Sequence, residues 1–250
     1  MNTQMKILGL CLLLAGTLSA QTKKLKCYPF KTAIVEYAYE GNTTGRQTLY
    51  IDDYGWTQCE MTQSTAKAFG QTVETKSVKL TKGLEIYQWD PMTRTGTKMH
   101  NSVLEELVND PDFDMDEFAK RTMEALGFQK TGTEMVKTWN CEVWKGMGST
   151  IWVWNNIAVK TEVKLLGQKN VLVAGKIQLD AALPAGRFDI PSDIKFNDAG
   201  NLDPMEMMSK AMEQAKQEEG APNEQTEETD EDETPMKSLK DLKGLFKKLK

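Results

Sequence analysis

Apolar and aromatic side chains alternate with polar ones in short runs, and turn-forming residues separate these runs along most of the chain. This two-residue period is typical of β-strands with one face buried. Strands are expected at residues 32–40, 46–53, 56–63, 74–82, 84–90, 133–146, 149–154, 157–167 and 170–180. Turn signals recur every eight to twelve residues, which favours an antiparallel meander over βαβ units. Asn155-Asn156 suits a two-residue hairpin turn, because asparagine tolerates the positive φ that such a turn requires.

One stretch has the pattern of a helix instead. Asp114 is placed as its N-cap with Glu117 three residues later, and Gly127 stands at its end. Its apolar stripe consists of Met115, Phe118, Met123 and Leu126. A shorter helical piece is expected over 103–108. The order is strands, one main helix and strands again, which predicts an α+β fold: a curved antiparallel sheet with a helix against one face.

Composition divides the chain into four parts. Residues 1–20 carry Lys6, a short apolar run and small residues before Gln21, which predicts a cleaved signal peptide. Residues 21–200 hold 22 basic and 23 acidic side chains, a nearly neutral single domain. Residues 201–235 hold 2 basic and 12 acidic side chains. This segment is expected to be partly helical and then to form a disordered acidic linker. Residues 236–250 hold six lysines and one aspartate. The overall acidity therefore belongs to the linker, and a neutral domain gives no support for nucleic-acid binding.

The last fifteen residues predict a basic amphipathic helix. Lysines surround one apolar face, which includes Leu239, Leu242, Leu245, Phe246 and Leu249. An isolated helix of this length is marginal in water, so it is expected to form on docking. Its target is left open between a membrane surface, a protein partner and its own domain.

Four tryptophans, at positions 139, 144, 152 and 154, stand within sixteen residues. In the stretch STIWVWNN, Trp152 and Trp154 point to one face of a strand, while Ile151 and Val153 point to the other. Either the tryptophans are core residues or some of them line an apolar pocket. The candidate ligand-binding set is Trp144, Trp152, Trp154, Phe118 and Met123.

The side chains needed for catalysis or metal binding are sparse. The only histidine, His100, is placed in an exposed loop, and no GxSxG, HExxH or phosphate-binding glycine loop occurs. A histidine-rich metal site is excluded, and no cofactor is expected. Three cysteines follow the leader, Cys27, Cys59 and Cys141, so one disulfide is compatible with an exported protein, with its pairing undetermined. A non-enzymatic protein is predicted.

The chain resembles the LolA/LolB-like superfamily of bacterial lipoprotein carriers and related secreted families. The resemblance covers about residues 30–195 and rests on AIVEYAYEG…GRQTLYIDDYG, the mid-chain helix, GTEMVKTWNCEVWKG followed by STIWVWNNIAVKTEV, and RFDIPSDI. It implies an incomplete antiparallel barrel with helices on its concave face and acyl chains held in the space between them. Under this resemblance Trp152 or Trp154 faces that space. The chain departs from the carriers in its cysteines, its acidic linker and its basic tail.

Together these patterns predict a periplasmic or secreted binding protein that holds a lipid or another hydrophobic ligand between sheet and helix. The alternative is a cell-envelope scaffold with a fully packed core, whose C-terminal tail docks on a partner or membrane. A bound ligand would separate the two.

Overall fold

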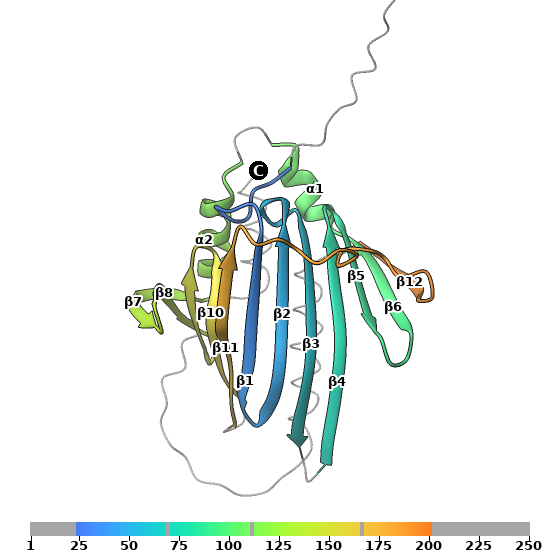
Figure 1. The fold of residues 1–250 in the computed structure, drawn as a ribbon. Coiled ribbons are helices and arrows are strands. Elements are labelled where there is room, and N and C mark those ends of the chain that lie inside the picture. The colour runs from blue at the N-terminus through green and yellow to red at the C-terminus, as the bar shows by residue number, and fades with distance from the viewer. Residues whose placement is uncertain (1–23, 69–70, 111–112, 166–167, 202–250) are drawn as a thin grey trace, which may run out of the picture.

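The computed structural model describes residues 24–68, 71–110, 113–165 and 168–201. Twelve strands, one 3-10 turn and two α-helices follow one another in this part of the chain (Figure 1). They are β1 (Ala33–Gly41), β2 (Thr43–Asp52), η1 (Asp53–Gly55), β3 (Thr57–Ala68), β4 (Gln71–Lys82), β5 (Glu85–Asp90), β6 (Thr95–His100), α1 (Ser102–Val108), α2 (Met115–Ala125), β7 (Gln129–Val136), β8 (Trp139–Gly146), β9 (Ser149–Trp154), β10 (Ile157–Leu165), β11 (Gln168–Leu179) and β12 (Lys195–Asn201). The predicted signal peptide, acidic linker and basic tail lie outside the described residues.

All twelve strands form one strongly curved sheet that does not close into a barrel. Its order is β12-β6-β5-β4-β3-β2-β1-β11-β10-β9-β8-β7. Neighbouring strands are antiparallel except at one edge, where β12 pairs with β6 in parallel. The predicted α+β class with a purely antiparallel sheet is therefore wrong, because the described chain is mostly β and its sheet is mixed.

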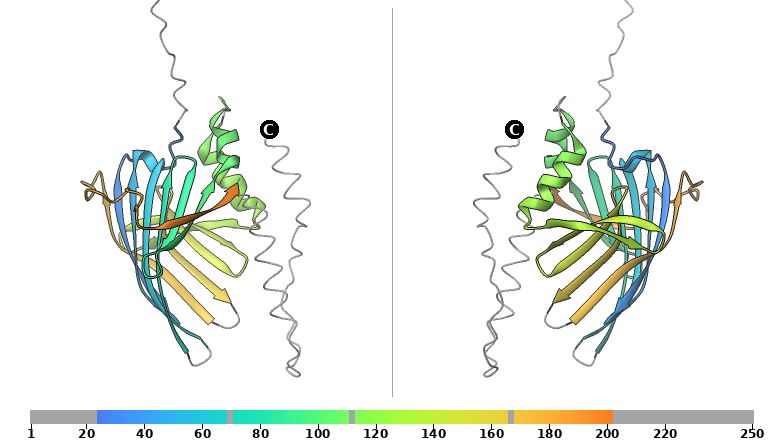
Figure 2. Two further views of the ribbon diagram at one scale, coloured as in Figure 1. Left: turned by 90° about the vertical axis from the view of Figure 1, so that its right-hand side faces the viewer. Right: turned by 90° about the vertical axis from the view of Figure 1, so that its left-hand side faces the viewer.

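The helices confirm the predicted local signals but not the predicted packing. Asp114 caps α2 and accepts hydrogen bonds from the backbone N–H groups of Asp116 and Glu117. Figure 2 shows α1 and α2 on the concave side of the sheet, near one end of the strands. No residue of α2 is buried, so the prediction of a helix packed on the concave face is corrected. An apolar stripe shows that a helix needs a partner surface, but it does not show how closely that surface approaches.

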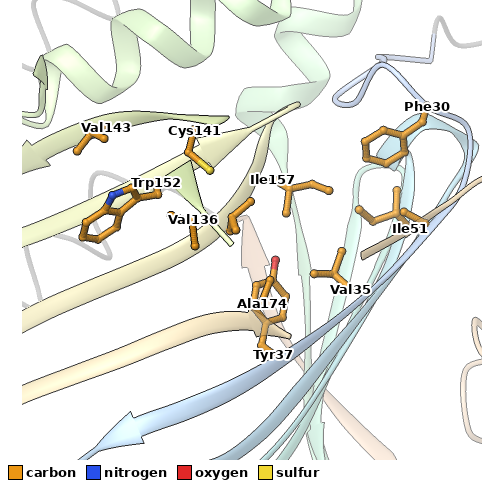
Figure 3. Close-up of a cluster of buried hydrophobic side chains, with 12 residues drawn as sticks. Phe30, Val35, Tyr37, Ile51, Val136, Cys141, Val143, Trp152, Ile157 and Ala174 are labelled. Carbon is orange, nitrogen blue, oxygen red and sulfur yellow. The ribbon is translucent and has the colours of Figure 1, made fainter. Parts of the chain in front are cut away.

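The main hydrophobic core joins β1 and β2 to β7–β11 (Figure 3). Phe30 from the segment before β1 covers one end of it. The members drawn are Phe30, Ala33, Val35, Tyr37, Ile51, Val136, Cys141, Val143, Trp152, Ile157, Val159 and Ala174. Burying the apolar side of a strand stabilises the fold by about 1.5–3 kcal/mol per large side chain, which explains the strict alternation along β1.

A second core lies on the opposite, convex face of the sheet. Cys59, Val78 and Leu80 of β3 and β4 are buried there, and the chain between β11 and β12 crosses over them. We call residues 180–194 the strap. Within it, Phe188 packs on this cluster and the Arg187 guanidinium lies 4.6 Å from the centre of the Tyr50 ring. The sequence did not predict the strap as a cover, because its residues show no strand or helix period.

Several strand boundaries differ from those predicted. The run 133–146 is broken by a turn at Lys137, whose φ is 55°, and forms two strands, β7 and β8. The strands β6 and β12 were not predicted, because both are short and largely polar. The hairpin turn at Asn155 and Asn156 is confirmed, with φ values of 48° and 63°.

Candidate functional site

The concave face changes from apolar to polar across the sheet. Val35 and Tyr37 on β1 lie opposite Leu49 and Gln47 on β2. One strand further, Leu49 lies opposite Glu60. The next pairs on this face are Gln47 with Thr62, Glu60 with Lys79, and Thr62 with Ser77. Because paired residues share a face, the register gives an apolar wall on β1, β2 and β11 beside a polar wall on β3 and β4.

Polar atoms at the seam between these walls are hydrogen-bonded. The Tyr39 hydroxyl donates to Gln47 Oε1 at 2.8 Å, and Gln47 is itself buried. The Tyr28 hydroxyl lies 3.3 Å from Gln58 Oε1. Burial is the main cause that raises the pKa of Tyr28 to about 12, so its phenol stays neutral. The seam is thus polar and uncharged, whereas Glu60 and Lys79 bring charge further along the face.

Helix α2 lies on the same concave side. Its apolar residues Met115, Phe118 and Met123 are half-buried, while Glu117, Lys120 and Glu124 on its other face are exposed. Asn156 holds the start of the helix, because its amide donates to Asp116 Oδ1 at 3.1 Å and to the Cys27 carbonyl at 3.0 Å. The helix is therefore tied at its N-terminus while its apolar stripe keeps solvent-accessible surface.

The tryptophans chosen from the sequence do not share one face. Val143 lies opposite Trp152, and Trp144 lies opposite Ile151. Because side chains alternate along β8 and β9, Trp144 and Trp152 lie on opposite faces of the sheet. Each is only 6% exposed. Trp154 is half-buried and packs on the main core, with its ring centroid 6.3 Å from that of Trp139.

Trp152 has two polar neighbours that the sequence did not indicate. Its indole N–H donates to Glu134 Oε2 at 2.8 Å. The Lys160 ammonium lies 4.0 Å from the centre of its ring, a cation–π distance. These contacts satisfy the only polar atom of the side chain, which is what a buried core tryptophan requires.

The candidate ligand-binding set also includes two residues outside β8 and β9. Phe118 and Met123 are on α2, where Phe118 contacts Phe113 at a centroid distance of 5.3 Å. The predicted docking residues Leu239, Leu242, Leu245, Phe246 and Leu249 lie outside the described residues.

Lys160 also borders a hollow of about 510 Å³ between the β1–β2 connection and β10–β11. Its lining includes Glu162 and Lys169, whose charged atoms are 2.9 Å apart. The Lys169 ammonium is the main cause that lowers the pKa of Glu162. Opposite charges neutralise each other in this hollow, so it does not select a strongly charged ligand.

His100 ends β6 rather than standing in a free loop. Its Nδ1 lies 2.8 Å from Glu85 and its Nε2 lies 2.9 Å from Glu105, so the ring joins the sheet edge to α1. The hydrogen bond to Glu85, followed by that to Glu105, raises the pKa of His100. Lys98 also pairs with Glu85, at 2.9 Å, and is the main cause that lowers the pKa of Glu85.

His100→Gln is expected to lower the melting temperature more at pH 5.5 than at pH 8.5. A pKa raised on folding contributes stability below the unfolded value of about 6.5, and this contribution disappears as the pH rises through the folded pKa. The exposed setting limits the effect to less than about 1 kcal/mol. Thermal unfolding of both proteins across this pH range tests it. A difference that does not change with pH would mean that the ring contributes by packing alone.

The cysteines and acidic residues give little chemistry. The three described cysteines are free thiols, and burial raises the pKa of Cys59 to about 11. Thiols with raised pKa values are poor nucleophiles. Among the described residues, no group of three or more His, Cys, Asp or Glu side chains could hold a metal ion. Within the same residues, neither helix has the length and apolar character that crossing a bilayer requires.

No family model and no curated protein sequence matches the chain. Solved structures do resemble it. An uncharacterised conserved protein from Thermus thermophilus is 6% identical, with a TM-score of 0.45, over 68% of this chain and 91% of the other. Lipoprotein LppX of Mycobacterium tuberculosis is 10% identical, with a TM-score of 0.30, over 62% and 90%. A putative outer membrane lipoprotein-sorting protein domain from Vibrio parahaemolyticus is 10% identical, with a TM-score of 0.28, over 68% and 94%.

The last two neighbours are named as a lipoprotein and as a putative outer membrane lipoprotein-sorting protein domain. All three TM-scores lie below 0.5. No residue role and no activity is carried from these proteins to this chain.

Proposed function

We propose that this chain is an exported, non-enzymatic binding protein for an amphiphile such as a lipid, held between the concave face of the sheet and α2. The supporting observation is the division of that face into an apolar wall and a polar wall. Acyl chains would lie along Leu49 and its apolar neighbours, and the polar group would meet the hydroxyl and charged side chains of β3 and β4.

Helix α2 supports the same proposal from the other side of the space. An amphipathic helix normally buries its apolar stripe, yet this one has no buried residue. A bound acyl chain would supply the missing cover for Met115 and Met123. At about 25 cal/mol per Å² of apolar surface, each ~40 Å² of the stripe that an acyl chain covers contributes about 1 kcal/mol.

The tryptophans play a different part in this proposal from the one first expected. Trp144 and Trp152 are almost fully enclosed by the protein, so we assign both to the packing of the sheet. Of the three tryptophans in the candidate set, Trp154 retains more accessible surface than Trp144 and Trp152. The ligand would contact Phe118, Met123 and the half-buried Leu49 of the apolar wall instead.

Native mass spectrometry of the chain from Gln21 onward, purified from an exporting host and then extracted with organic solvent, tests this proposal. A discrete extra mass that extracts as lipid is expected. Met123→Asp should lose that mass, since it places a carboxylate in the apolar stripe. Lys120→Asp, on the exposed face of the same helix, should keep it. Circular dichroism of both variants checks that they are folded. No bound mass in the parent protein, even after incubation with phospholipid, would reject the proposal.

A scaffold is the second candidate, and the burial of Trp144 and Trp152 favours it. In a scaffold the aromatic strands serve only to pack the sheet, and the tail binds a partner. An empty protein in the mass-spectrometric experiment would favour this alternative.

A further inference from the structure

The C-terminal amphipathic segment has an apolar face that needs a partner surface. Residues 236–250 place Met236, Leu239, Leu242, Leu245, Phe246 and Leu249 on one helical face. Six lysines and one aspartate cover the rest, a net charge of +5. A helix of fifteen residues gains little stability alone in water, so its partner must supply both apolar contact and negative charge.

The helical part of the described domain has that combination. The described residues 101–110 and 113–126 contain seven acidic side chains and two basic ones, a net charge of −5. The two basic residues are already paired within α2, Lys120 with Glu124 at 3.9 Å and Arg121 with Glu117. Beside this charge runs the half-buried stripe that contains Met115 and Met123. The two helices therefore carry both an apolar stripe and a surplus of acidic side chains.

The chain leaves the described domain next to this surface. The last strand, β12, pairs with β6 so that Asn201 lies opposite His100. His100 in turn contacts Glu105 on α1. Residues 202–235 then separate Asn201 from the segment, and a flexible chain of that length spans roughly 30 Å on average. Helix α2, with eleven residues, is about 16 Å long, which is shorter than this span.

We propose that residues 236–250 dock on the apolar stripe of α2, with their lysines against the acidic side chains of α1 and α2. The occupant is this chain's own tail, because its charge is opposite to that of the surface and it is tethered beside it. Tethering raises the effective concentration of the tail at this surface, which favours this contact over an untethered partner. One consequence of the docking rests on the proposed function: the docked tail would compete with the amphiphile for Met115 and Met123.

Disulfide trapping tests the docking directly. The full chain from Gln21 carries Cys27→Ser together with Leu242→Cys and Met123→Cys. The matched control pairs Leu242→Cys with Glu124→Cys, the next residue along α2, which lies on the exposed face. We expect the Met123 pair to cross-link within one molecule roughly tenfold faster than the Glu124 pair, because tethering alone acts on both equally. Replacing Lys240, Lys243 and Lys247 by glutamate should remove this preference.

Equal cross-linking rates for the two pairs would overturn the docking. A second result would also overturn it. In that result the full chain sediments with phosphatidylglycerol vesicles, a chain ending at residue 235 does not, and the vesicles abolish the faster cross-linking of the Met123 pair. That pattern would assign the tail to membranes. A preference that survives the lysine replacements would overturn the electrostatic part of the proposal.

Ligand competition separates this inference from the proposed function. Binding of a fluorescent fatty acid should be about tenfold tighter to the chain ending at residue 235, because the docked state no longer competes. If neither chain binds the probe but the Met123 preference holds, the tail docks and the carrier proposal fails. If both bind the probe equally and the preference is absent, the carrier proposal stands and the docking fails.

Discussion

Leu80→Ala is expected to lower the free energy of unfolding by about 2–5 kcal/mol, as large-to-small changes at fully enclosed positions do. Leu80 is 0% exposed and lies in the convex cluster with Cys59 and Val78. Phe188 of the strap packs on the same cluster, so the Leu80 side chain is enclosed only while the strap lies against the convex face. Urea unfolding followed by tryptophan fluorescence measures the effect.

Two valines on the same strand give a matched control for this prediction. Val78 is 7% exposed and Val73 is 51% exposed, both on β4. Val78→Ala should cost about 1.5–3 kcal/mol, whereas Val73→Ala should cost less than about 1 kcal/mol. If Leu80→Ala and Val78→Ala are as mild as Val73→Ala, the strap does not cover the convex face.

Gly45→Ala is expected to destabilise the protein by about 3 kcal/mol or more, through two causes that act together. Gly45 has φ +140°, which side-chain-bearing residues rarely adopt. A Cβ there would also stand 2.3 Å from the Gln63 carbonyl oxygen on β3, and backbone cannot move aside as a flexible side chain can. The pairing of β2 with β3 would have to open at this point.

Gly132→Ala separates the two causes. Gly132 has φ +149°, but a Cβ there meets nothing within 4 Å. It should therefore show only the conformational cost, about 1–2 kcal/mol. Chemical denaturation of both variants tests this. Equal losses at the two positions would show that the backbone angle alone decides the effect and that the close approach to β3 has no consequence.

The concave face and the tail offer one consistent account of how such a domain could handle an amphiphile. The apolar wall on β1, β2 and β11 and helix α2 lie on the same side of the sheet. The tail matches the apolar stripe of α2 in hydrophobicity, and its lysines are opposite in charge to the acidic side chains of α1 and α2. A ligand and the tail would then compete for one surface, and their relative affinities would decide which of them occupies it.

Local signals decided many of the individual elements. Asp114 and Gly127 bound the helix because capping and C-terminal stops depend on only a few neighbouring residues. Asn155 and Asn156 form their turn for the same reason. The buried side of β1 also follows from alternation, since Ala33, Val35 and Tyr37 all face the core.

Tertiary structure decided what depends on distant partners. The polar strand β12 exists because the strap brings it beside β6, and no alternation in its own residues predicts that. Trp144 and Trp152 look equivalent along the chain, yet the register of β8 with β9 places them on opposite faces. The sequence by itself determined the two helices, most of the strands and where charge accumulates, because these follow from near neighbours. Only the fold decided which apolar side chains are enclosed and which remain open to a ligand, because enclosure depends on residues far away in the chain.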